Sequence, residues 1–513
     1  MTGKRWSRAG AILLGMMLVF LFFYWRLSLV PIDSDYANLV LEGRDMMRGN
    51  ILLRGWYLTA ANFATTQLPF HALASLFFGA SCKTSIVANA LIDTCLVGAT
   101  LYMVWEKLAG PMRLMKCSVF FVCALCMNLV THELLRAHSG VFLWSMVALI
   151  LYRDCLDNGF RNGKKLTAFG ILVALAAVGD LIVAIYLVLP LCIIALVLWL
   201  QEKIGNKEFF ISLGSNIVSL LTGIVLSRIL YPQCVTLGND GFIDLEEFYH
   251  KLVLYIRCLL IMGDAEFEGK VFYSVWTVFY ALNVILIIAF WVIVIRETVR
   301  FIRGKSYDLY VLASGLGFAL LSFVFIFTTL SVDYMSLRYI TMFPFILPVV
   351  LIRFIAEKED KIRPNPGNIL LIAAVLLVIG RCMNMFIDVG STERNELGVG
   401  VPGKYIELRR ELEARGLNNG YAPFYSASFM TVHTDEEITI RAVNADAEGN
   451  VGQMTWGSKT SWYEPEAHFV MVVDSDVTSA SYDEVVERFG EPSETLVIED
   501  MTVLIYEQDI SLI

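Results

Sequence analysis

Apolar runs of about 20 residues recur along this chain from Ala9 to Asp388, and this repetition constrains the fold more than any other feature. An α-helix needs about 20 mostly apolar residues to cross a lipid bilayer. The composition agrees, because hydrophobic residues fill 57% of 513 positions and charged residues only 17%. Soluble domains usually contain about 45–50% apolar residues and about 25% charged residues. The sequence therefore predicts an all-α polytopic membrane domain over residues 1–387.

The charge balance changes after this membrane part. Residues 388–513 hold 24 Asp and Glu against 8 Lys and Arg, a net charge of −16, whereas the whole chain is −9 and residues 1–387 are therefore about +7. The overall acidity belongs to the C-terminal part and says nothing about nucleic acid, so no nucleic-acid partner is expected. We predict that residues 388–513 form a separate soluble domain.

The positive charges predict the topology. Basic residues fall in every second connection between the apolar runs, and cytoplasmic loops carry an excess of Lys and Arg. The pattern predicts a multi-pass protein of the cell membrane with a cytoplasmic N-terminus and, after eleven crossings, an extracytoplasmic C-terminal domain. The eleven predicted spans are 9–30, 85–105, 114–131, 140–153, 166–179, 182–200, 209–231, 272–295, 308–330, 339–356 and 368–387.

The first outer loop, residues 31–84, is the longest connection of the membrane part. Its segment Leu68–Gly79 is apolar but too short to cross, and a crossing there would invert the charge alternation. We therefore place it flat in the outer interface. Upstream, Asp33 and Asp35 open a predicted amphipathic helix that ends at Gly49. Asp is a favoured helix cap; alternatively, a carboxylate at this interface acts as a base toward an acceptor.

This loop resembles that of the GT-C superfamily, the polytopic glycosyltransferases that use polyprenyl-phosphate-linked sugars. The resemblance lies in an Asp just past the first span, an interfacial helix closing with Gly49-Asn50, the pair Trp56-Tyr57, and a short helix opening at Leu68-Pro69. Protein O-mannosyltransferases and the bacterial aminoarabinose transferases of lipid A are similar in layout over residues 1 to about 355. By this resemblance the catalytic Asp falls on Asp35, with Asp33 second, and Trp56 joins the substrate site.

The resemblance implies a glycosyltransferase at the outer face of the membrane. A polyprenyl-phosphate sugar would be the donor, reached through the membrane lipid, and a glycan, lipid or protein of the envelope would be the acceptor. The sequence identifies no cofactor and leaves a divalent metal open.

Polar residues crowd the loop THELLRAHSG at 131–140. One interpretation is a solvated loop. The other is a phosphate site, since Arg presents a rigid fork of donors, and the superfamily often carries polar residues here; we take Glu133, Arg136 and His138 as candidate substrate contacts. Asp180, between two apolar runs, is either a turn residue or a functional group at membrane depth.

Arg338-Tyr339 precedes the predicted span 339–356. Both residue types anchor helices at membrane interfaces. An Arg-Tyr pair at this place also recurs in GT-C enzymes, which implies binding of the substrate phosphate.

Residues 388–513 predict a small α/β domain. KYIELRRELEAR and SYDEVVERFG have helical periodicity, whereas EEITIRAV, HFVMVVDS and LVIEDMTVLIYE are typical of strands. The aromatic residues here suit either core packing or sugar stacking.

Two other functions compete with glycosyl transfer. A transporter or flippase for a lipid-linked or envelope component predicts broken helices and ionisable groups at mid-membrane depth. A non-catalytic membrane scaffold predicts that Asp33, Asp35 and Arg338 are replaceable without consequence.

Overall fold

The computed structural model describes residues 2–512 except 235–240, 268, 270–273, 362–363, 447 and 465. The chain divides into two compact units, which are described separately. The helical unit comprises Met1–Leu27, Leu91–Arg228 and Gly238–Ser391. The sheet unit comprises Ser28–Ala90, Ile229–Leu237 and Thr392–Ile513. The whole of the first predicted outer loop, residues 31–84, thus clusters with the C-terminal domain.

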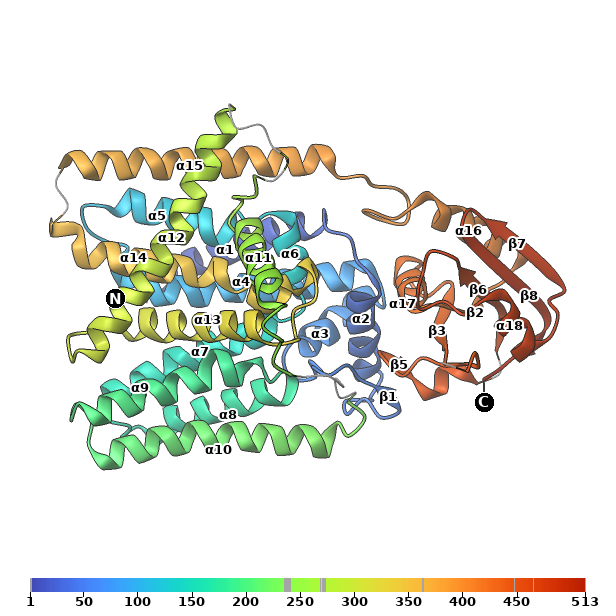
Figure 1. Ribbon diagram of the computed structural model, residues 1–513, viewed down its shortest axis with the longest axis horizontal. Helices are drawn as coiled ribbons and strands as arrows, with labels where there is room; N and C mark the ends of the chain where they lie inside the picture. Colours follow the sequence, from blue (N-terminus) through green and yellow to red (C-terminus); the bar gives the residue numbers. More distant parts are fainter. Residues whose placement is uncertain are drawn as a thin grey trace. The chain divides into compact units, whose positions relative to one another are not determined.

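Long helices make up the helical unit (Figure 1). Small residues allow neighbouring helices to pack closely. Where the helix with Gly223 meets the helix with Ala174, a Cβ atom added at Gly223 would lie only 2.5 Å from the Ala174 carbonyl oxygen. The elements are α1 Thr2–Leu27, α4 Cys82–Val104, η1 Trp105–Lys107, α5 Arg113–Phe120, η2 Phe121–Leu125, α6 Leu129–Leu135, α7 Ser139–Asp157, α8 Gly163–Gly179, η3 Ala184–Val188, α9 Leu189–Leu200, α10 Asn206–Leu230, α11 Phe248–Met262, α12 Val275–Ile302, α13 Leu309–Phe327, η4 Tyr334–Ile340, α14 Phe343–Lys358, η5 Glu359–Lys361 and α15 Pro364–Ser391. The start of α4, residues 82–90, and the end of α10, residues 229–230, belong to the sheet unit.

The described helices confirm a multi-pass membrane protein by length and hydropathy, with 7 candidate spans, or up to 9 if two bent pairs each count as one. The eleven predicted spans exceed the larger count by two, and the exact number stays a prediction. The predicted span 166–179 is a helix of 17 residues, α8, and the span 182–200 is the short apolar helix Ala184–Leu200. The first two residues of the predicted span 272–295 lie outside the described residues.

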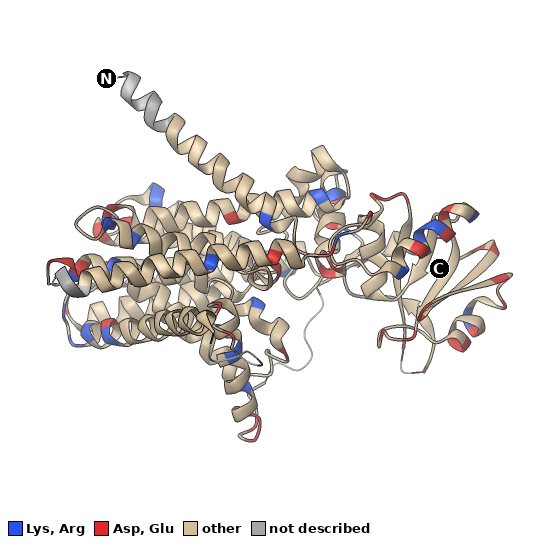
Figure 2. Ribbon diagram, turned by 90° about the horizontal axis from the view of Figure 1, so that it is seen from above, with Lys and Arg blue, Asp and Glu red and all other residues tan. Residues whose placement is uncertain are grey.

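The basic connections of the helical unit meet at one end of the bundle (Figure 2). Arg353, near the end of α14, is 2.9 Å from Glu106 of η1, which also contacts Arg153 of α7 at 3.5 Å. Lys203, after α9, donates to the carbonyl oxygen of Gly304, after α12, at 2.9 Å. Connections that the sequence assigns to one side of the membrane thus lie together, and which side this is stays a prediction.

An ion pair joins α15 to the end of α11. Arg381 Nη1 lies 2.5 Å from Asp264 Oδ2, and the two side chains are only 6% and 8% exposed. Arg381 also donates to the Gly263 carbonyl at 2.7 Å and to Asn283 Oδ1 at 3.0 Å. Asn128 donates to the other Asp264 oxygen at 2.8 Å. These bonds satisfy charges that would otherwise be costly inside a bundle of apolar helices.

The sheet unit contains a six-stranded mixed sheet with helices, which confirms the coarse form of the α/β prediction. The strand order is β4-β3-β2-β6-β8-β7, with β2 parallel to β3 and β6 and the other pairs antiparallel. The elements are α2 Ser34–Met47, β1 Trp56–Tyr57, α3 Leu68–Phe78, α16 Gly403–Arg415, β2 Asn419–Ala422, α17 Phe424–His433, β3 Thr439–Ala445, β4 Val451–Gln453, β5 Ser458–Lys459, η6 Thr460–Tyr463, β6 Ala467–Val473, α18 Tyr482–Phe489, β7 Glu494–Ile498 and β8 Met501–Ile510.

Helices α2 and α3 belong to the core of this unit. A Cβ at Gly43 of α2 would lie 2.8 Å from the Cβ of His71 of α3, so only glycine permits this approach. Ser428 of α17 donates to Asn38 of α2 at 2.6 Å, and β1 pairs with β5. Helix α3 has 11 residues, too few to span a bilayer.

Candidate functional site

The two candidate carboxylates at the start of α2 differ in role. Asp33 is the N-cap: its Oδ1 accepts from the backbone N–H of Tyr36 at 3.1 Å. Asp35 lies in the first turn and its side chain is exposed. The capping interpretation therefore applies to Asp33, and it leaves the Asp35 carboxylate at the surface of the sheet unit near the positive end of the helix dipole.

Trp56 lies in the interior of the sheet unit, 1% exposed. Its Nε1 donates to Asp45 Oδ2 at 2.8 Å, and its ring packs edge-on against Trp462 at 4.7 Å. Lys459 Nζ lies 3.1 Å from the other Asp45 oxygen. In this position Trp56 ties α2 to the C-terminal residues.

Glu42 is a buried acid that the sequence interpretation passed over. It is 3% exposed, and burial raises the pKa of its carboxyl group to about 8. Among the described residues no ion pair or hydrogen bond of this group is found, and the Cys234 thiol is close enough to interact with it electrostatically. The helical periodicity of α2 shows Glu42 as polar but gives no sign that this position is buried.

We expect Glu42→Gln to stabilise the protein at alkaline pH. Because the pKa is higher in the folded state than the usual 4.5, the stability linked to Glu42 is complete below about pH 4.5 and is lost as the pH rises through about 8. A difference of one between the folded and unfolded pKa values corresponds to about 1.4 kcal/mol, so the gain at pH 9 should reach about 2 kcal/mol or more. Thermal unfolding in detergent at pH 6 and pH 9 measures it. Glu407→Gln, at an exposed position, is the control; an equal gain there would contradict the assignment.

Four predicted contacts come together in the helical unit. His138, the N-cap residue of α7, has its Nδ1 2.6 Å from Asp180 Oδ2, and both side chains are nearly buried. Asp180 also caps the backbone N–H of Ile182 at 3.0 Å. The Tyr339 ring lies 5.3 Å from the His138 ring, and the Arg338 guanidinium lies 5.1 Å from the Tyr339 centroid. We call these residues the His138 cluster: His138, Asp180, Arg338 and Tyr339.

Close in sequence to His138, Arg136 and His132 belong to a second group of buried titratable side chains, together with Asp93. Arg136, 3% exposed, donates through Nε to the backbone carbonyl of Glu133 at 3.2 Å. It interacts electrostatically with Asp93 of α4, which is 2% exposed. His132 Nδ1 lies 3.9 Å from Asp93 Oδ2. The sequence interpretation missed Asp93, although a lone acid inside an apolar run was a usable signal.

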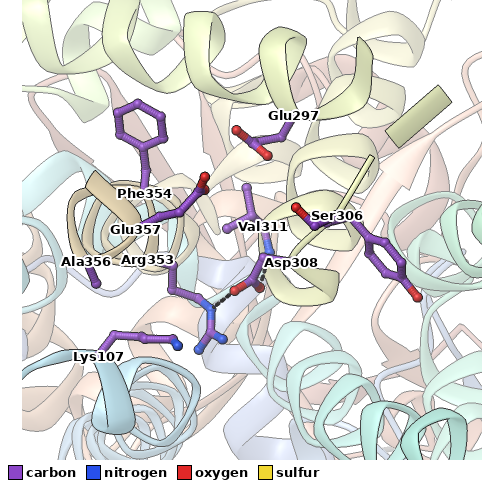
Figure 3. Close-up of a pocket in the computed structure, with 10 residues that line it drawn as sticks. Lys107, Glu297, Ser306, Asp308, Val311, Arg353, Phe354, Ala356 and Glu357 are labelled. Carbon is purple, nitrogen blue, oxygen red and sulfur yellow. Dashed lines mark hydrogen bonds and ion pairs between the residues drawn. The ribbon is translucent and has the colours of Figure 1, made fainter. Parts of the chain in front are cut away.

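A pocket of 220 Å³ opens at the C-terminal end of α14 (Figure 3). The charged side chains that line it form ion pairs. Arg353 Nε lies 2.6 Å from Asp308, which also lines the pocket, and Glu297 and Glu357 each lie 3.0 Å from Arg300, beside the pocket. Asp308 also caps α13. These bonds join the basic connections at that end of the bundle, and none of the residues predicted for the site lies here. We therefore do not base a function on this pocket.

A metal site was left open by the sequence. Over the described part of the chain, no group of three or more His, Cys, Asp and Glu side chains is placed to hold a metal ion.

Comparison with models of known protein families, with curated proteins and with solved structures found no match in any of the three. The class that the fold defines is a polytopic membrane protein whose C-terminal domain is a mixed β-sheet with helices.

Proposed function

We propose that this protein is a GT-C-type glycosyltransferase that moves a sugar from a polyprenyl-phosphate donor to an envelope acceptor at the outer face of the membrane. The observation that carries the proposal is the His138 cluster. Its members come from three segments far apart in the chain, and each is a candidate contact on the sequence alone. A guanidinium stacked on a tyrosine, beside a histidine bonded to an acid, suits the binding of a phosphate.

In the proposed reaction Asp35 is the base. The acceptor hydroxyl or amine gives its proton to the Asp35 carboxylate as its oxygen or nitrogen bonds to the anomeric carbon. The bond from that carbon to the lipid phosphate oxygen breaks, and the phosphate leaves with the electron pair. The transition state resembles an oxocarbenium ion. Arg338, with Arg136, would stabilise the charge that develops on the phosphate. The exposure of Asp35 supports the assignment, since an acceptor must reach it.

The direct test compares cells that carry the gene with cells that lack it. Mass spectrometry of envelope glycans, glycolipids and glycoproteins should show one class of product that lacks a sugar, with the corresponding polyprenyl-phosphate sugar accumulating. If both pools are unchanged under conditions in which the protein is made, the proposal is wrong.

Arg338→Lys should weaken donor binding. Lysine keeps the charge but loses the planar fork and the contact with the Tyr339 ring. Hydrogen bonds to charged groups are worth about 1.5–3 kcal/mol, so the KM for the lipid donor should rise about 10- to 100-fold. Arg257→Lys is the control, because Arg257 forms an ion pair with Glu266 that is 3.5 Å long and largely exposed. An unchanged KM in Arg338→Lys would remove this residue from the site.

A transporter or flippase is the second candidate, favoured by the two broken helices. Arg113–Leu125 and Leu129–Leu135 meet at 64°, and Tyr334–Ile340 and Phe343–Lys358 at 48°. Discontinuous helices are typical of transporter binding sites. The two functions predict different products: a flippase changes the side on which a lipid is found and leaves its sugar in place. Purified protein in vesicles that hold a labelled polyprenyl-phosphate sugar distinguishes them.

A further inference from the structure

The last residue of α17, His433, has both ring nitrogens bonded to backbone carbonyls. Nδ1 lies 2.8 Å from the oxygen of Leu397, and Nε2 lies 3.0 Å from the oxygen of Ile32. A carbonyl oxygen accepts hydrogen bonds and cannot donate them. A ring protonated on one nitrogen can donate to only one of these oxygens, whereas the imidazolium, which carries a proton on each nitrogen, can donate to both.

The surroundings of the ring suit a positive charge. His433 ends a helix, where the dipole favours a cation. The Phe429 ring lies 4.3 Å away. Gly398 has a φ of 148°, which favours glycine, and a Cβ there would come within 3.1 Å of the imidazole. The ionisable groups that face His433 are the Cys82 thiol, 3.4 Å from Nδ1, and Asp435, which interacts with it electrostatically. Asp435 also interacts with Lys83, Glu437 and Arg409.

The bond to Ile32 acts on the start of α2. Ile32 directly precedes Asp33, the N-cap, and Asp35 follows in the first turn. Two more bonds join α17 to α2: Ser428 Oγ to Asn38 Oδ1 at 2.6 Å, and the Phe429 N–H to Ser34 Oγ at 3.1 Å. Helix α17 of the C-terminal domain thus holds α2 along its first two turns, and of these three bonds the one from His433 has the donor that can carry a charge.

We propose that His433 is a positioning residue whose doubly protonated ring fastens the beginning of α2 and the Leu397 turn to α17, so that the order of the segment carrying Asp35 depends on pH. The consequence for catalysis rests on the function proposed above. The clamp itself does not. Imidazole changes charge between about pH 5 and 8, and loss of one proton leaves one of the two carbonyls facing a nitrogen that cannot donate.

Hydrogen exchange followed by mass spectrometry, on the whole protein in detergent, tests the clamp without any transfer assay. Between pH 6.0 and pH 8.0, after correction for the chemical exchange rate, we expect protection of peptides covering 30–38 and 395–400 to fall about tenfold. This matches the loss of one charge-assisted bond of about 1.4 kcal/mol. Peptides of β8 should keep their protection and report that the fold is intact.

His433→Gln should show low protection in the two peptides at both pH values. His468→Gln removes a histidine whose side chain is 36% exposed, and Cys82→Ser removes the neighbouring thiol; both should keep the wild-type pH dependence. Unchanged protection in the wild type between the two pH values would overturn the proposal, and so would the same pH dependence in His433→Gln. Because the wild-type measurement needs no variant, a misfolded variant does not prevent a decision. A failed transfer assay would count against the proposed function alone.

Discussion

Asp35→Asn should lower the rate of sugar transfer by about 10²–10⁴, the usual contribution of a general base. The amide keeps the size of the side chain and removes the basic oxygen. Because Asp33 caps α2 and Asp35 is exposed, the variant should express and unfold like the wild type. Transfer from a polyprenyl-phosphate sugar by the purified protein is the measurement.

Asp33→Asn is the matched control, two residues away on the same turn. Asn is also a good N-cap, so stability should change by less than the about 0.5–2 kcal/mol that loss of a cap costs, and activity should persist. If transfer survives in both single variants and in the double variant, neither carboxylate is the base. If Asp33→Asn alone abolishes transfer, the base is Asp33 and the assignment to Asp35 is wrong.

Arg381→Met should destabilise the helical unit by about 3–5 kcal/mol, the effect of leaving a buried charge without its partner. The partner is Asp264, 2.5 Å away, and both side chains are almost fully enclosed. Thermal unfolding in detergent, together with the yield of folded protein, measures the effect.

The double variant Arg381→Met/Asp264→Asn tests the cause. It removes both charges, while the amide introduced at position 264 can keep a bond with Asn128, so most of the lost stability should return. Arg257→Met is the control for loss of a surface ion pair, worth about 0–1 kcal/mol. A double variant no more stable than Arg381→Met would show that packing around Arg381, and not the charge of Asp264, is responsible.

Local signals predicted a good part of this fold. The helix KYIELRRELEAR appears as α16 and ends at Gly416, whose positive φ of 68° suits glycine. LVIEDMTVLIYE forms the β7–β8 hairpin with Glu499 at the turn, at a φ of 51°. Such features depend on periodicity and turn residues within about a dozen positions, which a single sequence displays.

Features that depend on distant partners were not predictable in the same way. Neither β2 nor α17, which the segment GYAPFYSASF at 420–429 contributes to, was among the predicted elements. Both depend on distant chain, β2 through pairing with β6 and α17 through packing on α2. Glu42 follows the polar periodicity of α2 although it is buried, and Cys234, a group that interacts with it, lies far downstream in the chain. The predicted spans and the structure differ at α8 and α9, where hydropathy runs on through a region that the structure divides into short helices. The sequence named each member of the His138 cluster as a candidate, but it did not predict the bond between His138 and Asp180.

The pairing of β1 with β5 has a consequence for biosynthesis. Lys459 of β5 forms an ion pair with Asp45, and the two residues are 414 positions apart in the chain. At about 5–20 residues per second, a ribosome needs roughly 20–80 seconds to travel from one to the other. During that interval helices α2 and α3 have left the ribosome without the C-terminal partners of Asn38 and Trp56. Until synthesis is almost complete, the nascent chain thus exposes side chains of α2 and β1 whose partners have not yet been made. We expect a chaperone or the translocation machinery to shield them during this time.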